Sequence, residues 1–473
     1  MPYVKTWQLI AGSAVSGLAL SVAVVAAAGP WDSGQRKAER DRAASWGGTG
    51  GADHGGTGLP QAAPSAPGVL GAVGPAAPRS EVAAASSGLA GVLKPLLADP
   101  ALGSVRTASV VDVGSGQVLY EAGAGDAMTP ASTIKIVTAA AALAALGPEH
   151  RIKTSVVGGA GAGQIVLVGG GDPSLTAKKK SPAGSGGSLV ALAADTAQAL
   201  KAAGTGSVTL AYDDSLFVAG RHPIGANPNI APVTALAADE GRPDDSVSGP
   251  VERSEDPAKD AARAFAGLLA ERGVKVTGEP VRAKAAGGAQ PLAVTLSTPV
   301  GGLVERMLTN SDNDIAEALA RQTALASGQP ASFDGAEKAV GARLAGLGVD
   351  VSGARFADGS GLNRADKVSA GLLTGLLAKA ADPGHPELRP VLTGLPVAGF
   401  TGTLRARNAG TSPAAGLLRA KTGTLTGVNS LSGTVVDSSG RLVAFAFLTA
   451  NSADGSAAEK GLDKLAAAVA STS

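Results

Sequence analysis

The stretch ASTIKIVTAAAALAALG, residues 131–147, is the feature that most constrains how this sequence can fold. Apart from Ser132, Lys135 and two threonines, it is apolar and rich in alanine. Alanine and leucine are strong helix formers, and the Gly147-Pro148 pair is a typical helix stop. The sequence therefore predicts a helix here, with Ser132 and Lys135 at its head.

Ser132 and Lys135 are spaced for chemistry as well as for structure. Residues three apart lie one above the other on the same face of a helix. A hydroxyl and an amine held in this way exchange a proton if the lysine is neutral, which requires its pKa to fall from about 10.4 toward neutrality. Burial against the apolar face would lower the pKa. The alternative is that Ser132 caps the helix and Lys135 is an exposed charge, and the stretch alone does not decide between them.

The composition excludes several classes of function. The net charge is +1 and no long basic run is present, so the sequence carries no electrostatic footprint for nucleic acid. The absence of cysteine excludes disulfides, thiolate metal sites and a cysteine nucleophile. The four histidines lie far apart without metal-binding spacing, at His54, His150, His222 and His385. We therefore expect no nucleic-acid partner, no metal and no cofactor.

The N-terminal segment predicts export. Residues 9–29 carry no charge and follow Lys5, and their length matches a membrane-spanning helix. The segment, taken as residues 1–30, is expected to be a membrane anchor or a secretory signal. Residues 31–85 are rich in Gly, Pro and Ala, which favours a disordered tether. The remaining chain is thus expected in the cell envelope, outside the cytoplasm, either membrane-anchored or secreted.

The rest of the chain, which is long enough for two or three domains, predicts a sheet built from its two ends. Regular structure is expected to begin near Ser86. The patterns indicate a helix at 88–100, a strand hairpin at 105–113 and 116–122, three strands at 417–426, 429–439 and 441–450, and a closing amphipathic helix at 457–470. The middle of the chain mixes a helix at 256–273 with short strand-like runs.

Two further polar clusters follow Ser132 and Lys135 along the chain. Ser311-Asp312-Asn313 comes immediately before a predicted helix, and Lys421-Thr422-Gly423 lies within a predicted strand. Each cluster alone has an ordinary explanation, because Ser311 or Asn313 could be a helix N-cap and Lys421 a solvent-facing residue. Ser-x-x-Lys, Ser-x-Asn and Lys-Thr-Gly, however, each occur once and in this order.

This set resembles the active-site motifs SxxK, SxN and KTG of the penicillin-binding proteins and serine β-lactamases. Together with LVGGGDPSL, APVTALAADEG and FADGSGLNR, it makes the sequence similar to the D-alanyl-D-alanine carboxypeptidase/endopeptidase family of low-molecular-mass penicillin-binding proteins, peptidase family S13. The resemblance implies an α+β fold of the β-lactamase/transpeptidase type. In that fold an antiparallel sheet is flanked by helices, and a helical cluster carries the Ser311–Asn313 motif across a cleft from the Lys421 strand.

The chain between Ser132 and Ser311 is far longer than one catalytic fold needs between these motifs. In the family that the sequence resembles, this region holds additional small domains. We therefore expect inserted domains at residues 153–291 and a discontinuous catalytic domain made of residues 86–152 and 292–473.

The resemblance and the chemistry together suggest the catalytic roles. Peptide hydrolysis through an acyl-enzyme needs a nucleophile with a base within hydrogen-bond reach, and Ser132 with Lys135 meets this requirement if Lys135 is neutral. By resemblance, Ser311 relays a proton to the leaving amine. The backbone N–H groups of Ser132 and Thr424 form the oxyanion hole in the same way.

Substrate contacts follow from the same resemblance. Asn313 binds a substrate carbonyl, and Lys421 with Thr422 anchors the terminal carboxylate of D-Ala-D-Ala or of a β-lactam. Gly423 is expected to let the substrate lie close to the strand. The expected partners are peptidoglycan peptides as substrates, β-lactams as inhibitors and, through the N-terminal segment, the membrane.

Three other stretches indicate a function less specifically than the motifs do. By resemblance to the family, Arg364 is expected to bind a carboxylate on the diaminopimelyl side chain; alternatively, it forms a structural ion pair. Asp172, in GGGDPSL, favours a tight turn over a catalytic carboxylate. The stretch GRHPIGANPNIAP, residues 220–232, departs from the Trp-Pro pattern usual in the family, which puts the contacts of the inserted region in doubt.

Two alternative functions remain open from the sequence. A β-lactamase would need a means of activating a deacylating water, and no Glu-x-x-Leu-Asn motif of class A enzymes lies between Asn313 and Lys421. A wall-binding scaffold without activity would not need the motif side chains, which are all present. The expected function is a serine-type D-Ala-D-Ala carboxypeptidase or endopeptidase.

Overall fold

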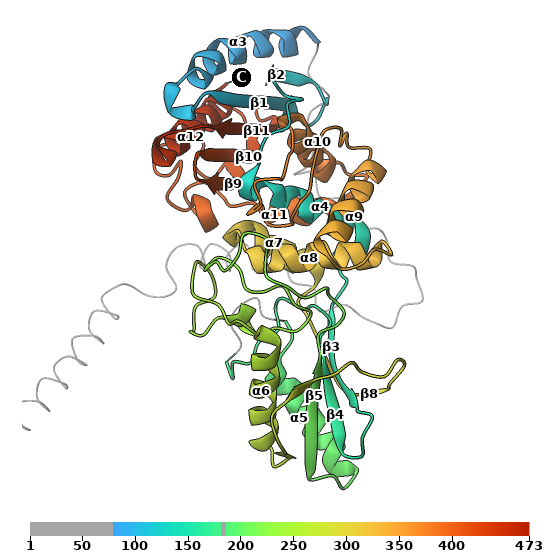
Figure 1. The fold of residues 1–473 in the computed structure, drawn as a ribbon. Helices are drawn as coiled ribbons and strands as arrows, with labels where there is room; N and C mark the ends of the chain where they lie inside the picture. The colour runs from blue at the N-terminus through green and yellow to red at the C-terminus, as the bar shows by residue number, and fades with distance from the viewer. Residues whose placement is uncertain (1–78, 181–185, 473) are drawn as a thin grey trace, which may run out of the picture. The chain divides into compact units, whose positions relative to one another are not determined.

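The computed structural model describes residues 79–180 and 186–472. One part of the fold is a five-stranded antiparallel sheet in the strand order β2-β1-β11-β10-β9. Its strands are β1 (Val105–Asp112), β2 (Val118–Ala122), β9 (Leu418–Leu425), β10 (Val428–Val436) and β11 (Leu442–Ala450). β1 pairs with β11, which confirms that the two ends of the chain meet in one sheet (Figure 1).

Helices cover both faces of this sheet, because alternate residues of its strands point into two separate apolar cores. α3 (Arg79–Leu97) and α12 (Gly455–Ser471) pack on one face. α4 (Lys135–Leu146) and α10 (Ala370–Ala381) belong to the core on the other face (Figure 1). The predicted closing helix is therefore confirmed as α12.

A cluster of helices surrounds α4. Its other members are α7 (Val300–Asn310), α8 (Asn313–Ala326), α9 (Phe333–Gly346) and α11 (Arg389–Thr393). Every residue of α4 from Lys135 to Leu143 is buried, since its many alanines let neighbouring helices approach closely. The first turns of α4, including Lys135, are thus buried, while the half-buried Ser132 precedes them.

The helix predicted over 131–147 is divided at Lys135. Residues Ala131–Ile134 form one turn of 3-10 helix, and α4 begins only at Lys135. Ala131 enters this turn with a left-handed φ of 50°, so the regular α-helix cannot extend back through it. The predicted stop is confirmed, because α4 ends before Gly147, whose φ is 81°.

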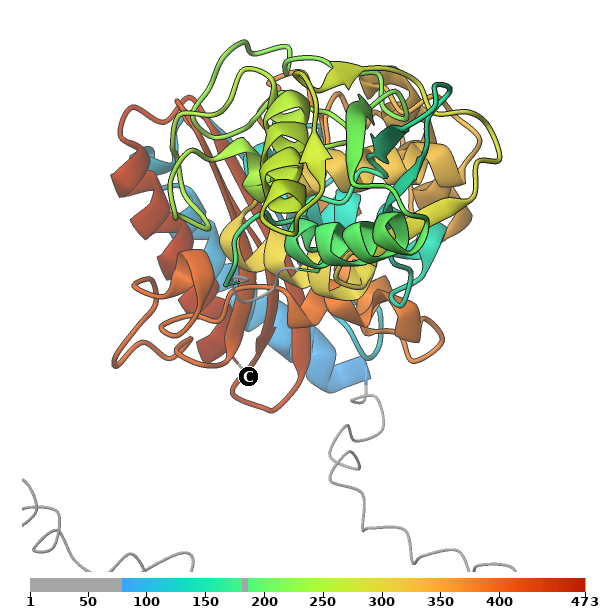
Figure 2. The same cartoon turned by 90° about the horizontal axis from the view of Figure 1, so that it is seen from below.

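The chain between α4 and α7 forms a second sheet with its own core. Its strands are β3 (Lys153–Gly158), β4 (Gln164–Val168), β5 (Ser207–Asp213), β6 (Lys275–Val276), β7 (Val281–Arg282) and β8 (Pro291–Leu296). α5 (Leu189–Ala202) and α6 (Pro257–Ala270) lie side by side on one face of it (Figures 1 and 2).

Two expected boundaries shift in the structure. β8 pairs with β3, with Val294 opposite Ser155, so residues 292–296 belong to the inserted sheet and not to the second catalytic segment. Helix α3 begins at Arg79, earlier than the expected start of regular structure near Ser86, so residues 79–85 are helical and not part of a tether.

Among the described residues, no helix is both long enough and apolar enough to cross a membrane. The predicted anchor or signal segment, residues 1–30, lies outside the described residues, as does the predicted tether up to residue 78.

Gly433 of β10 tests whether the close approach of β9 leaves no room for a side chain at this position. A Cβ at this position would lie 2.5 Å from the Cα of Ala420 and closer still to the carbonyl oxygen of Arg419. We expect Gly433→Ala to lower the free energy of unfolding by about 1–3 kcal/mol, as overpacking does in other cores. Urea denaturation measures this change. The control Gly91→Ala, on α3 with no atom within 4 Å, should be neutral or slightly stabilising; equal losses in both variants would rule out strand crowding as the cause.

Candidate active site

Ser132 and Lys135 meet where the 3-10 turn joins α4. The Nζ atom of Lys135 lies 3.1 Å from the Oγ atom of Ser132, because side chains three apart stack directly in 3-10 geometry. Lys135 has 0% exposed surface, so it is not an exposed charge. Ser132 does not cap α4, whose N-cap residue is Ile134. The alternative interpretation of this pair is therefore wrong.

The Lys135 amine has two closer partners than Ser132. Its Nζ lies 2.7 Å from Oδ1 of Asn313 and 2.6 Å from the carbonyl oxygen of Ser360. Each of these oxygens accepts one N–H. A neutral amine has only two N–H groups, so its lone pair points toward the third neighbour, the Ser132 hydroxyl. This geometry suits Lys135 to accept the hydroxyl proton.

The surroundings of Lys135 also favour its neutral form. Burial lowers the pKa of Lys135 from 10.5 to about 8, although the carboxylates of Asp358, Asp312, Glu317 and Asp366 act in the opposite direction. A charged amine loses most of its hydration when it is buried, which is the physical origin of the fall. The neutral amine is therefore accessible at mildly basic pH.

Lys421 is the second buried amine of the site. It lies in β9 with 0% exposed surface, and its Nζ donates to the carbonyl oxygen of Thr422 at 2.8 Å. Burial, followed by the positive charge of Lys135, lowers the pKa of Lys421 well below its usual value. A carboxylate placed beside this amine would oppose both effects, since a negative charge favours the charged form.

Ser311, Asp312 and Asn313 form the turn between α7 and α8. Ser311 ends α7 with a left-handed φ of 58°, and Asp312 caps α8 by accepting the N–H of Ile315 at 3.0 Å. The alternative that Ser311 or Asn313 is the N-cap is therefore wrong. Because Asp312 does the capping, Ser311 and Asn313 are available to line the cavity that also contains Ser132.

A cavity of about 490 Å³ joins the motifs to the inserted region. The motif segments contribute Ser132, Ser311, Asn313 and Thr424 to its lining, and the inserted region contributes Asn227, Asn229, Arg242 and Arg253. The Nδ2 of Asn313 donates to the carbonyl oxygen of Asn229 at 2.9 Å. The inserted region therefore forms one wall of the site and touches a motif residue directly.

Gly423 lets the edge strand β9 approach the Ser132 turn. A Cβ at this position would lie 2.6 Å from the carbonyl oxygen of Pro130 and 3.1 Å from the amide nitrogen of Ser132. The first distance is shorter than real Cβ contacts and the second is tight, so glycine alone fits here without a shift of the Ser132 turn. The structure thus shows a packing role for Gly423, and the expectation that it lets substrate lie close to the strand stays a prediction.

The threonines beside Gly423 have separate partners. The Oγ1 of Thr422 lies 3.0 Å from that of Thr403, and the Oγ1 of Thr424 donates to Glu459 at 3.0 Å. Their strand, β9, is the last strand of the sheet. Residues 396–398 hydrogen-bond to its first half, at Leu418 and Ala420, and from Lys421 onward no strand of the described residues lies beside its outer side. An extended peptide can pair with an edge of this kind.

Arg364 belongs to the loop that precedes α10, and this loop brings it beside the end of β9. It is exposed, and its Nη2 donates to the carbonyl oxygen of Thr426 at 2.7 Å. Among the described residues no carboxylate forms an ion pair with it, so the structural ion pair considered from the sequence is not seen. Leu425, the neighbour of Thr426, lines the cavity.

Asp172 forms the tight turn predicted for GGGDPSL. Its Oδ1 accepts the N–H of Ser174 at 2.7 Å and the hydroxyl of Ser174 at 2.6 Å. Burial raises the pKa of Asp172 to about 6, and the two bonds from Ser174 oppose this rise. The cavity that contains Ser132 has other lining residues, which agrees with a structural role.

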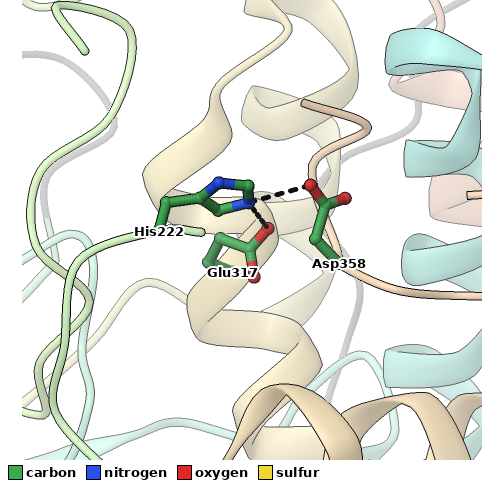
Figure 3. Close-up of side chains that lie close together, drawn as sticks. All are labelled: His222, Glu317 and Asp358. Carbon is green, nitrogen blue, oxygen red and sulfur yellow. Dashed lines mark hydrogen bonds and ion pairs between the residues drawn. The ribbon is translucent and has the colours of Figure 1, made fainter. Parts of the chain in front are cut away.

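Sequence reasoning missed three buried residues behind Lys135. They are His222 of the inserted region, Glu317 of α8 and Asp358 of the loop before α10, and their polar atoms converge (Figure 3). His222 belongs to the stretch that departs from the family pattern, and this departure was its only signal. The same stretch does contact the motif region, since the N–H of Ala231 donates to Asp314 at 2.9 Å.

Comparison with known proteins agrees with this site. The profile of the D-Ala-D-Ala carboxypeptidase 3 (S13) family matches residues 89–252 and 241–469. A carboxypeptidase of Mycobacterium tuberculosis is 38% identical over 77% of this chain and 80% of its own length. The carboxypeptidase DacB of Mycolicibacterium smegmatis is 37% identical over 81% of this chain and 84% of its own length.

The fold has a solved counterpart. The crystal structure of penicillin binding protein 4 from Haemophilus influenzae aligns with a TM-score of 0.65 and 23% identity, covering 80% of this chain and 97% of that one. The predicted α+β fold is confirmed by this alignment, and the predicted enzyme class by the family profile and the two mycobacterial relatives. The chain belongs to the D-Ala-D-Ala carboxypeptidase 3 (S13) family of serine peptidases.

Proposed function

We propose that this S13 carboxypeptidase cleaves D-Ala-D-Ala peptides and cross-links of peptidoglycan through an acyl-enzyme on Ser132. The observation that carries the proposal is the buried Lys135 amine. Asn313 and Ser360 accept from it at 2.7 and 2.6 Å, while the Ser132 hydroxyl lies 3.1 Å away. This arrangement is that of a base beside its nucleophile.

In the acylation step, Ser132 Oγ attacks the carbonyl carbon of the penultimate D-Ala and gives its proton to Lys135. The resulting oxyanion accepts from the backbone N–H groups of Ser132 and Thr424, each such donor contributing about 3 kcal/mol in serine peptidases. The C–N bond then breaks, and the leaving amine takes a proton through Ser311, which lines the same cavity. Water later hydrolyses the ester and restores the Ser132 hydroxyl.

Substrate binding uses the edge of β9 and the opposite wall. Lys421 and Thr422 anchor the terminal carboxylate, which supplies the negative charge that favours the charged amine of Lys421. The amide of Asn313 binds the carbonyl on the penultimate side. Arg364 is exposed at the end of β9 and binds a carboxylate on the side chain of a diaminopimelyl residue.

The location of the enzyme follows from its family. S13 peptidases act on the cell wall, so the described part of the chain works outside the cytoplasm. Residues 1–30 serve in this proposal as a membrane anchor or secretion signal. The following residues, up to 78, serve as a tether that lets the catalytic domain reach the wall.

Penicillin and related β-lactams are proposed inhibitors. The penicillin binding protein 4 of Haemophilus influenzae has been solved in complex with a β-lactam. A β-lactam offers a carboxylate for Lys421 and Thr422 and a strained amide for Ser132. No observation favours the alternative functions of β-lactamase or inactive scaffold.

Removal of the proposed base tests the mechanism. Lys135→Ala should fold but acylate at least about 100-fold more slowly, because general bases contribute about 10²–10⁴ in rate. Stopped-flow labelling with a fluorescent penicillin measures the acylation rate, and thermal unfolding checks the fold. The exposed Lys201→Ala is a matched control that should acylate normally. Acylation of Lys135→Ala at the wild-type rate would refute the assignment.

The fate of the acyl group separates a peptidase from a β-lactamase. After acylation by benzylpenicillin, the opened thiazolidine ring stays attached and hinders water, whereas D-Ala diffuses away. Mass spectrometry of the intact protein should therefore show one penicilloyl adduct that persists well beyond the turnover time for peptide. Ser132→Ala should show none. Rapid adduct loss with continuous penicillin hydrolysis would instead indicate a β-lactamase.

A further inference from the structure

The carbonyl oxygen of Ser360 is one of the two acceptors that orient the Lys135 amine, yet it belongs to a loop. This oxygen accepts from Lys135 Nζ at 2.6 Å and lies 3.5 Å from the Ser132 hydroxyl. The direction of a backbone carbonyl is set by the conformation of the loop to which it belongs. The position of this loop therefore decides where the lone pair of Lys135 is directed.

Two buried carboxylates hold the loop by its backbone N–H groups. Asp358 accepts from Ser360 at 3.0 Å, from Gly361 at 2.6 Å and from Asn363 at 2.7 Å. Glu317, on α8, accepts from Gly359 and Ser360, both at 3.0 Å. The Ser360 carbonyl is thus fixed mainly through the orientation of these two carboxylates.

His222 holds the Asp358 carboxylate from the other side. Its Nε2 lies 2.9 Å from Oδ2 of Asp358, and the side chain has 0% exposed surface (Figure 3). The N–H of Ile224 donates to Nδ1 of the same ring at 3.3 Å, so Nε2 carries the proton and donates it to Asp358. The ring also packs edge-on against Phe333, with 5.3 Å between ring centroids.

The charges around this cluster fit a hydrogen-bonded clamp better than a cation site. Ligand atoms of His222, Glu317 and Asp358 lie within 4.8 Å of one another, as a metal would require. The Nε2 lone pair is not available, however, because Nε2 donates to Asp358. The guanidinium of Arg321 already supplies a positive charge, with Nη1 3.0 Å from Glu317. Asp366, the remaining acid nearby, accepts the N–H of Asp358 at 3.1 Å.

We propose that His222, from the inserted region, is a positioning residue for the acylation step: through Asp358 it fixes the Ser360 carbonyl, and through that carbonyl it directs the Lys135 lone pair at Ser132. This inference rests on the proposed role of Lys135 as the base. It gives the inserted region a part in nucleophile activation, in addition to lining the cavity. No contact between His222 and substrate is involved.

The substitutions His222→Gln and His222→Asn test this proposal, because both introduce an amide and the two side chains differ in length by one methylene group. In His222→Gln the amide nitrogen occupies the place of Nε2 and can donate to Asp358, whereas in His222→Asn it reaches only the place of Nδ1. We expect His222→Asn to lower the acylation rate at saturating penicillin by about 10- to 100-fold, since small misplacements of catalytic groups have effects of this size. His222→Gln should stay within about fivefold of wild type.

The penicillin concentration for half-saturation should be unchanged in both variants, because neither alters a residue that binds substrate. A general loss of structure would lower the thermal midpoint and change both constants together. The matched control is His385→Asn, which removes a histidine paired with Glu387 at 2.9 Å on the partly exposed surface and should acylate normally.

The outcomes separate this inference from the mechanism on which it rests. If both amide variants acylate at the wild-type rate, or if both lose activity equally, the hydrogen bond to Asp358 does not position the base and the inference is wrong. Loss of wild-type acylation on treatment with EDTA would show a metal at this cluster and would also overturn it. Normal acylation by Lys135→Ala, measured in parallel, would instead refute the base itself.

Discussion

The geometry of the candidate active site depends on the burial of one amine. Lys135 contacts Ser132 within its own turn, Asn313 at the start of α8 and Ser360 in the loop before α10. These three partners come from segments far apart in the sequence, so the amine is satisfied only when the helical cluster and the loop have all assembled. A buried amine without such acceptors would cost several kcal/mol, which ties the integrity of the site to that of the fold.

The inserted region forms part of the candidate active site and is not an independent attachment. The carbonyl oxygen of Asn229 accepts a hydrogen bond from the side chain of Asn313 at 2.9 Å. The backbone N–H of Ala231 donates to the carboxylate of Asp314, also at 2.9 Å. Arg253 adds an ion pair with Asp314 at 2.6 Å. These contacts brace the turn that presents the Ser311 motif. The large insertion between the Ser132 and Ser311 motifs therefore helps to hold the cavity that these motifs line.

Motif residues and regular elements could be predicted from the sequence, because both have local signatures. The strands of the five-stranded sheet show alternating patterns, and SxxK, SxN and KTG are set by residue type. The role of Ser360 could not be predicted, since it acts through a backbone carbonyl that any residue would supply. His222 and Glu317 were missed because their meeting is a product of tertiary structure. The predicted end of the insertion was wrong for the same reason. Only the pairing of β8 with β3 shows that β8 belongs to the inserted sheet.

The central claim is that Lys135 is held as a base, and its pKa tests this most directly. Lysines labelled with ¹³C at the ε-carbon give NMR signals whose shifts follow protonation, and Lys135→Arg identifies the signal of interest. Burial lowers the pKa of Lys135 to about 8, so the signal should titrate near pH 8, with the amine neutral above that value and charged below it. A midpoint near the ordinary lysine value of about 10.4 would contradict the account, because the amine would then remain charged at the pH at which the enzyme works.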